Sequence, residues 1–117
     1  VETIFLERSF LKNHSTKKTI EFKSKTTNKI IYFYPNYGLD KSTENYSYIR
    51  LIIHPSIVVS SLESISGIKI NSREEFHSNM RSFPSKINIG QTPCHYGIGL
   101  NIEPFALEKF LSFFDTL

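Results

Sequence analysis

The residues best suited to chemistry in this sequence are its one cysteine and three of its four histidines. Cys94 and His95 are adjacent, whereas His54 and His77 lie in other segments. Imidazole and thiolate are natural zinc ligands, and a thiolate beside an imidazole can serve as a nucleophile with its base. None of the spacings is a zinc signature, however, and neighbouring side chains of an extended segment point to opposite faces. We therefore expect no metal site, no catalytic residue and no cofactor.

Carboxylate pairs and phosphate-binding glycine loops are also weakly supported. Glu74 and Glu75, like Glu103 and Glu108, belong to expected helix starts or outer helix faces, where acids favour the helix dipole or solubility. The motif Gly97-Ile98-Gly99 lacks the third glycine and the following helix of a dinucleotide-binding turn. The sequence thus predicts a protein that is not an enzyme.

Basic residues gather in two segments of the chain. Between residues 12 and 29 there are six lysines and a single acid, Glu21; residues 69–86 hold a second basic stretch. The second stretch is interleaved with His, Asn, Gln and aromatic residues. Lys and Arg neutralise phosphates, Asn and Gln can read adenine edges, and aromatic rings stack on unpaired bases. The residues expected to contact nucleic acid are Lys17, Lys18, Lys23, Lys25, Lys29, Arg73, Asn79, Arg81, Lys86, Gln91 and Tyr96.

The leading hypothesis is therefore a non-catalytic nucleic-acid-binding module, with DNA favoured over RNA as the partner. It requires the cations of both segments to converge on one face. The alternative is a small cytoplasmic protein–protein interaction domain, including a homodimer, that binds no nucleic acid. Tyr34, Tyr37, Tyr46 and Tyr48 are amphipathic aromatic residues of the kind that anchor interfaces, and the exposed edges of small sheets dimerise readily.

The composition predicts a globular domain. The chain has 117 residues, of which 39% are hydrophobic and 21% charged, with a formal net charge of +3. A lone cysteine excludes an internal disulfide and fits a reducing compartment, and no run of about 18 apolar residues offers a membrane span. We expect a single cytoplasmic domain over residues 1–117. Because the sequence starts with Val1, that domain can also be part of a longer chain.

The periodicities predict an α+β fold. Residues 2–12 have helical spacing, residues 18–24 and 29–34 form a hairpin around Thr26–Asn28, and residues 48–53 form a central strand. Residues 37–47 are expected to be a loop. The expected sheet is small and mainly antiparallel, with three helices packed on one face.

The second half of the chain completes this expectation. A stripe from Ile57 to Ile65, closed by Gly67, predicts a middle helix. Residues 68–70 predict a short strand, and Ser72-x-x-Glu75 matches a capping box. Residues 81–99 suggest an ordered loop with a strand at about 95–100. Pro104 followed by an apolar stripe at i, i+3, i+4 and i+7 predicts the C-terminal helix.

Three short motifs carry a family resemblance from about residue 48 onward. They are Ile52-Ile53-His54-Pro55, Phe83-Pro84 and His95-Tyr96-Gly97-Ile98, followed by Ala106-Leu107-Glu108 and Leu111 in the last helix. In order and rough spacing, these motifs resemble a family of small bacterial cytoplasmic proteins of unknown function, typified by enterobacterial YgaC. The resemblance implies a compact α+β domain and no particular activity or site residue.

Overall fold

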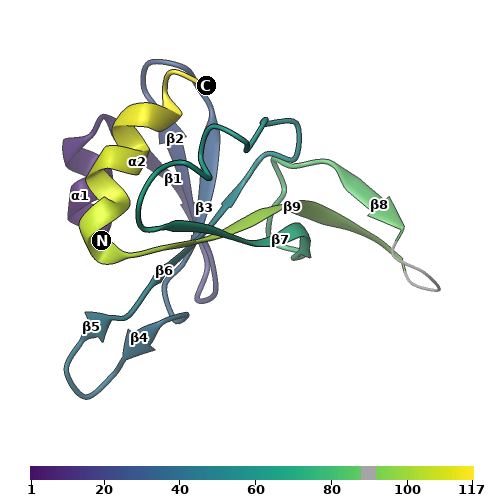
Figure 1. Cartoon of the computed structure of the whole chain (residues 1–117). Helices are drawn as coiled ribbons and strands as arrows, with labels where there is room; N and C mark the ends of the chain where they lie inside the picture. Colours follow the sequence, from purple (N-terminus) through teal and green to yellow (C-terminus); the bar gives the residue numbers. More distant parts are fainter. Residues whose placement is uncertain (88–91) are drawn as a thin grey trace.

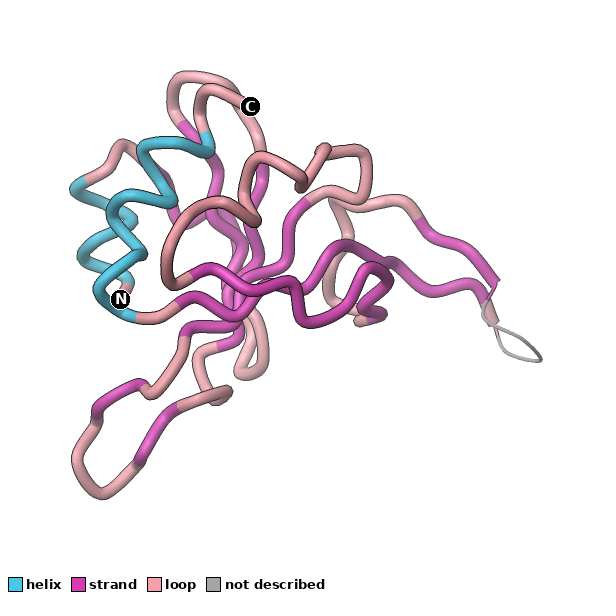
Figure 2. Tube along the Cα trace, in the orientation of Figure 1, coloured by secondary structure: helices cyan, strands magenta, loops and turns pink. Residues whose placement is uncertain are grey.

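The main element of the fold is one antiparallel sheet, seen in a computed structural model that describes residues 1–87 and 92–117. Seven strands lie in the order β1-β2-β3-β6-β9-β7, with β8 also paired to β9 (Figure 1; Figure 2). The strands are β1 (Phe10–Ser15), β2 (Ile20–Ser24), β3 (Ile30–Tyr34), β6 (Ile49–Ile53), β7 (Ile68–Phe76), β8 (Ser85–Ile87) and β9 (Pro93–Ile102). The remaining elements are the hairpin β4 (Leu39–Asp40) and β5 (Asn45–Tyr46), helices α1 (Glu2–Glu7) and α2 (Leu107–Phe114), and a 3-10 turn over Pro104–Ala106.

Both helices cover the same face of the sheet, which we call the helix face (Figure 1). Alternate strand residues such as Phe22, Phe33 and Leu51 point into this core. Phe5 of α1 stacks on Phe22, with ring centroids 4.0 Å apart. The predicted stripe of α2 is confirmed, because Leu107, Phe110, Leu111 and Phe114 are all buried.

The opposite face, which we call the tyrosine face, carries Tyr32, Tyr34 and Ile52. Residues 77–84, the crossover segment, pass over it and pack Met80 and Phe83 against these side chains. Backbone hydrogen bonds join His77 to one edge of β9 and Pro84 to the other: the His77 N–H donates to the His95 carbonyl, and the Tyr96 N–H donates to the Pro84 carbonyl. Strands β3 and β6 are consequently buried on both faces.

The predicted middle helix is wrong. Residues 54–67 form a series of turns on the helix face, and the described residues contain only the N-terminal and C-terminal helices. Val59 and Leu62 do reach the core, so the apolar spacing is used. The segment nevertheless combines β-branched residues with five serines, and both kinds have low helix propensity. Short turn hydrogen bonds, such as that from the Leu62 N–H to the Val59 carbonyl, satisfy the backbone instead.

Other boundaries also differ from the sequence expectations. The N-terminal helix ends at Glu7, because Ser9 takes a left-handed conformation (φ 67°) and Phe10 begins β1. The Ser72-x-x-Glu75 motif lies within the nine-residue strand β7 and caps no helix. The expected loop at 37–47 contains β4 and β5, and the strand expected at 95–100 extends over Pro93–Ile102. For β7 and β9, whose pairing partners are distant in the sequence, long-range pairing overrides the local preferences.

Candidate nucleic-acid interface

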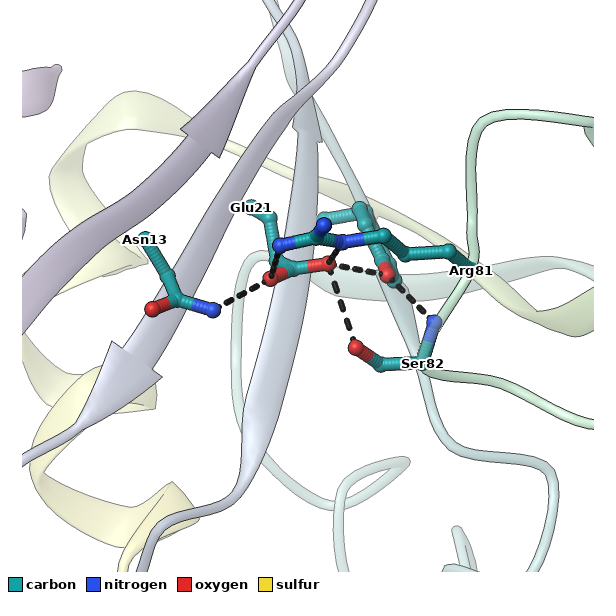
Figure 3. Close-up of polar contacts among 5 residues, drawn as sticks. Asn13, Glu21, Arg81 and Ser82 are labelled. Carbon is teal, nitrogen blue, oxygen red and sulfur yellow. Dashed lines mark hydrogen bonds and ion pairs between the residues drawn. The ribbon is translucent and has the colours of Figure 1, made fainter.

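A buried carboxylate organises the tyrosine face near β1 and β2. The Glu21 side chain is 1% exposed and accepts hydrogen bonds from Tyr32 Oη at 2.5 Å and Asn13 Nδ2 at 2.6 Å. Ser82 Oγ donates at 3.2 Å, and Arg81 approaches with Nε and Nη2, both at 3.4 Å (Figure 3). The three consecutive strands β1, β2 and β3 therefore meet the distant crossover segment at one side chain.

The polar contacts keep Glu21 ionised. Burial by itself raises the pKa of Glu21, but the hydrogen bonds from Tyr32, Asn13 and Arg81, together with the Arg81 charge, outweigh it and hold the pKa below its ordinary value. Burial, reinforced by the hydrogen bond to Glu21, raises the pKa of Tyr32 to about 12. Tyr32 thus remains a hydrogen-bond donor, and its oxygen in turn accepts from the Ser82 N–H at 2.9 Å.

Arg81 contacts the buried carboxylate and is also partly exposed to solvent. It lies over the Glu21 carboxylate and so helps to fasten the crossover segment to β2 (Figure 3). Its side chain is still 56% exposed. The predicted site residue is therefore accessible, but the adjacent carboxylate offsets much of its charge.

The turn between β1 and β2 brings Lys17 and Lys18 beside the crossover segment. Thr16 Oγ1 accepts from the backbone N–H groups of Lys18 at 3.2 Å and Thr19 at 3.1 Å, which closes the turn. Asn79 Nδ2 donates to the same Thr16 oxygen at 3.2 Å. Predicted residues from the two basic segments therefore do meet here: Lys17, Lys18, Asn79 and Arg81. We call these four residues the turn surface.

The other hairpin lysines lie progressively farther from the turn surface. Lys23 is within β2, whereas Lys25 and Lys29 flank the turn at the opposite end of that strand. This second turn is tied to the C-terminus of α2, since Asp115 accepts from Ser24 Oγ at 2.7 Å. Among the residues that the structure describes, none of the five predicted lysines forms an ion pair: Lys17, Lys18, Lys23, Lys25 and Lys29.

The remaining predicted residues are not gathered at the turn surface. Arg73 pairs with Glu63 at 3.3 Å, and Lys86 pairs with Glu74 while its Nζ lies 4.9 Å from the centroid of the Tyr96 ring. Strand β8, which carries Lys86, and the Pro93 end of β9 project away from the helices (Figure 1). Gln91 lies outside the described residues. Convergence of the two basic segments is therefore partial.

A pocket of about 430 Å³ borders the turn surface and is lined by Lys18, Tyr34, Asn36, Tyr37 and His77. Of these five residues, only Lys18 is among the predicted nucleic-acid contacts. The signal that was available is the Pro35-Asn36-Tyr37-Gly38 turn directly after a wholly apolar and aromatic strand, which suggests burial on both faces and side chains gathered at the strand end. Burial, then the nearby Lys18 charge, lowers the pKa of His77, so this ring is neutral at pH 7.

Arg50 contacts Tyr37, one of the residues that line this pocket. It is almost wholly buried, donates from Nε to Asn101 Oδ1 at 2.6 Å, and pairs through Nη1 with Glu75 at 3.2 Å. Its guanidinium carbon lies 5.1 Å from the centroid of the Tyr37 ring. The ion pair therefore fixes a cation against Tyr37 and helps to hold that ring in place.

Comparison of the chain with protein-family models, curated proteins and solved structures found no match. The resemblance to the YgaC-like family therefore stays a prediction. Within residues 1–87 and 92–117, no group of three or more His, Cys, Asp or Glu side chains is arranged to hold a metal ion. None of the helices in these ranges is long and apolar enough to span a membrane.

Proposed function

We propose that this protein binds nucleic acid, without catalysing a reaction, through the turn surface and the lysines that continue from it along β2. The observation that carries the proposal is the anchoring of Lys17 and Lys18 next to Asn79, outside any ion pair among the described residues. The backbone of this turn is already fixed, so binding phosphates costs only the freedom of the lysine side chains and no further ordering of the turn itself.

The charge distribution favours an extended anion over a single small one. Glu21 is buried and neutralised by Arg81, so it opposes the lysine field weakly. At about 3.3 Å per extended residue, Lys18 and Lys25 are at most roughly 23 Å apart. About seven nucleotides of one B-form strand span the same distance. A phosphate backbone following β2 can therefore reach both ends.

Charge reversal at the turn tests this proposal. We expect Lys17→Glu combined with Lys18→Glu to weaken binding to a labelled 20-nucleotide DNA by at least about 10-fold in low salt, because two phosphate contacts become repulsive. The slope of log K against log salt should become shallower by about 1.4 on single strands and about 1.8 on duplex DNA. Fluorescence anisotropy at several salt concentrations measures both quantities.

The matched control reverses two exposed lysines elsewhere, Lys41→Glu with Lys109→Glu, and changes the net charge by the same amount. It should retain most of the affinity and of the salt slope. Equal losses in the two double variants would indicate a net-charge effect and would remove the turn surface as the site. Failure of the unaltered protein to bind duplex DNA, single-stranded DNA or RNA in low salt would refute the proposed function.

A second candidate function, self-association or protein binding, is favoured by one feature of the sheet. Strand β1 is an edge strand, and its Leu11 side chain is 48% exposed. The same strand has a bulge between Lys12 and His14, and both lysines and bulges protect edges against pairing. Nucleic-acid binding is therefore the leading proposal. A dimer in sedimentation velocity that persists at high salt, without affinity for nucleic acid, would favour the second function.

A further inference from the structure

We propose that the pocket lined by Lys18, Tyr34, Asn36, Tyr37 and His77 receives one unpaired base of a single-stranded nucleic acid, with a neighbouring phosphate on Lys18. This inference rests on the proposed function, and it names single strands as the preferred substrate class. The pocket's volume of about 430 Å³ is near the lower end of the range for small-molecule sites, which suits one nucleotide better than a larger ligand.

Tyr37 supplies a stacking surface. Its side chain is 47% exposed, although its ring is fixed by two neighbours. The Tyr34 ring meets it edge-on, with centroids 5.1 Å apart and planes at 69°, and the Arg50 guanidinium lies 5.1 Å from its centroid. An exposed aromatic ring held in a fixed orientation is the element that proteins use to bind bases without requiring a particular sequence. A base inside a duplex cannot reach it, because both of its faces are stacked on neighbouring pairs.

Two side chains that line the pocket have polar atoms suited to hydrogen bonds with a base edge. Asn36 Nδ2 donates to the Lys17 carbonyl at 3.3 Å, which leaves the amide oxygen as an acceptor for an exocyclic amino group. His77 Nδ1 accepts from the Asn79 N–H at 3.1 Å, so the proton of the neutral ring is on Nε2 and can be donated. The pocket thus offers one acceptor and one donor beside the stacking ring.

Lys18 belongs both to this pocket and to the turn surface, where phosphates are proposed to bind. It lines the pocket, and its backbone is held by the hydrogen bond from its N–H to Thr16 Oγ1. The Asn36 contact to the neighbouring Lys17 carbonyl ties the same turn to the tyrosine side of the pocket. The residues proposed to contact the base and the phosphate are therefore joined by hydrogen bonds, so they hold a fixed relative position. Recognition of a nucleotide within a strand requires such a fixed arrangement.

The test compares Tyr37→Ala with Tyr37→Phe, using a fluorescein-labelled 20-nucleotide single strand and its duplex. Loss of the ring should weaken single-strand binding by about 10-fold or more, because base stacking of this kind contributes about that much affinity. Tyr37→Phe should preserve the affinity for the single strand. Tyr48→Ala is the matched control: Tyr48 also lies beside the Arg50 guanidinium, at 5.7 Å, but does not line this pocket. A single strand carrying 2-aminopurine should change its fluorescence on binding the unaltered protein and not on binding Tyr37→Ala.

The outcomes separate the two proposals. Salt-dependent binding that is lost in the Lys17/Lys18 double variant but kept in Tyr37→Ala would overturn the base pocket and leave the proposed function standing. Absence of any binding by the unaltered protein would refute both. Equal affinity for single strand and duplex would overturn the pocket. Tight binding of adenosine monophosphate that competes poorly with the 20-nucleotide strand would also overturn it in favour of a free nucleotide.

Discussion

Glu21→Gln should lower the free energy of unfolding by about 2–4 kcal/mol, since it removes a buried charge whose partners then remain unsatisfied. Tyr32, Asn13, Ser82 and Arg81 all donate toward this carboxylate. Glutamine has one acceptor oxygen and an amide group that is itself a donor, so several of these donors would face another donor. Urea unfolding at pH 7, followed by circular dichroism, measures the loss.

The pH dependence gives this prediction a second signature. The pKa of Glu21 is lower in the folded protein than its ordinary value of 4.5. The unfolded chain therefore takes up a proton first as the pH falls, and the stability from ionised Glu21 is present above pH 4.5 and lost as the pH drops through the folded pKa. The difference between the unaltered protein and Glu21→Gln should shrink in that range. An exposed control, Glu103→Gln, should change stability by less than about 0.5 kcal/mol; an equal effect of both variants would contradict a special role for Glu21.

Gly97→Ala should cost about 3 kcal/mol, the upper part of the range for inserting atoms into a packed interior. A Cβ at Gly97 would lie 2.6 Å from the Ile53 carbonyl oxygen, 2.7 Å from Ile52 Cγ2 and 3.0 Å from Phe83 Cδ2. The Ile53 carbonyl belongs to the backbone of central strand β6, so it cannot move away without disturbing the sheet. The melting temperature should fall by roughly 10 °C, measured by scanning calorimetry.

Gly99→Ala provides the comparison on the same strand. A Cβ there would lie 2.2 Å from Glu75 Oε1, but its next contacts are at 3.1 Å and 3.5 Å, also on Glu75. The end of a glutamate side chain can rotate, although doing so loosens the ion pair with Arg50. We expect a loss of about 1 kcal/mol. A Gly97→Ala protein as stable as Gly99→Ala would mean that Ile53 and Ile52 of β6 and Phe83 do not approach Gly97 as closely as the structure places them.

The two glycines have a structural role that their sequence motif does not indicate. Gly97-Ile98-Gly99 resembles part of a phosphate-binding motif but lacks its third glycine and following helix. Its structural reason is the close approach of β6 and the Phe83 ring to Gly97, and of the Glu75 side chain to Gly99. None of these neighbours is near in the sequence, so the local pattern alone could not supply this reason.

The sequence by itself determined the elements whose signal is local. The alternation of residues 18–24 and the β-branched and aromatic run at 29–34 specified the β2–β3 hairpin. The spacing from Leu107 to Phe114 specified α2 and its buried stripe. The same kind of signal failed for residues 54–67, where the apolar spacing is helical but the serines and β-branched residues disfavour a helix. Apolar spacing indicates which residues are buried. It does not indicate whether the backbone that carries them is a helix or a series of turns.

Only the tertiary structure decided which charges act together. Arg81 and Glu21 are sixty residues apart, and they meet because the crossover segment passes over β3 from one edge of β9 to the other. That path depends on long-range pairing and packing, which no window of neighbouring residues encodes. The same path separates Lys86 from the hairpin and brings His77 and Asn79 beside Lys18 and Thr16, so only part of the predicted basic surface is gathered in one place.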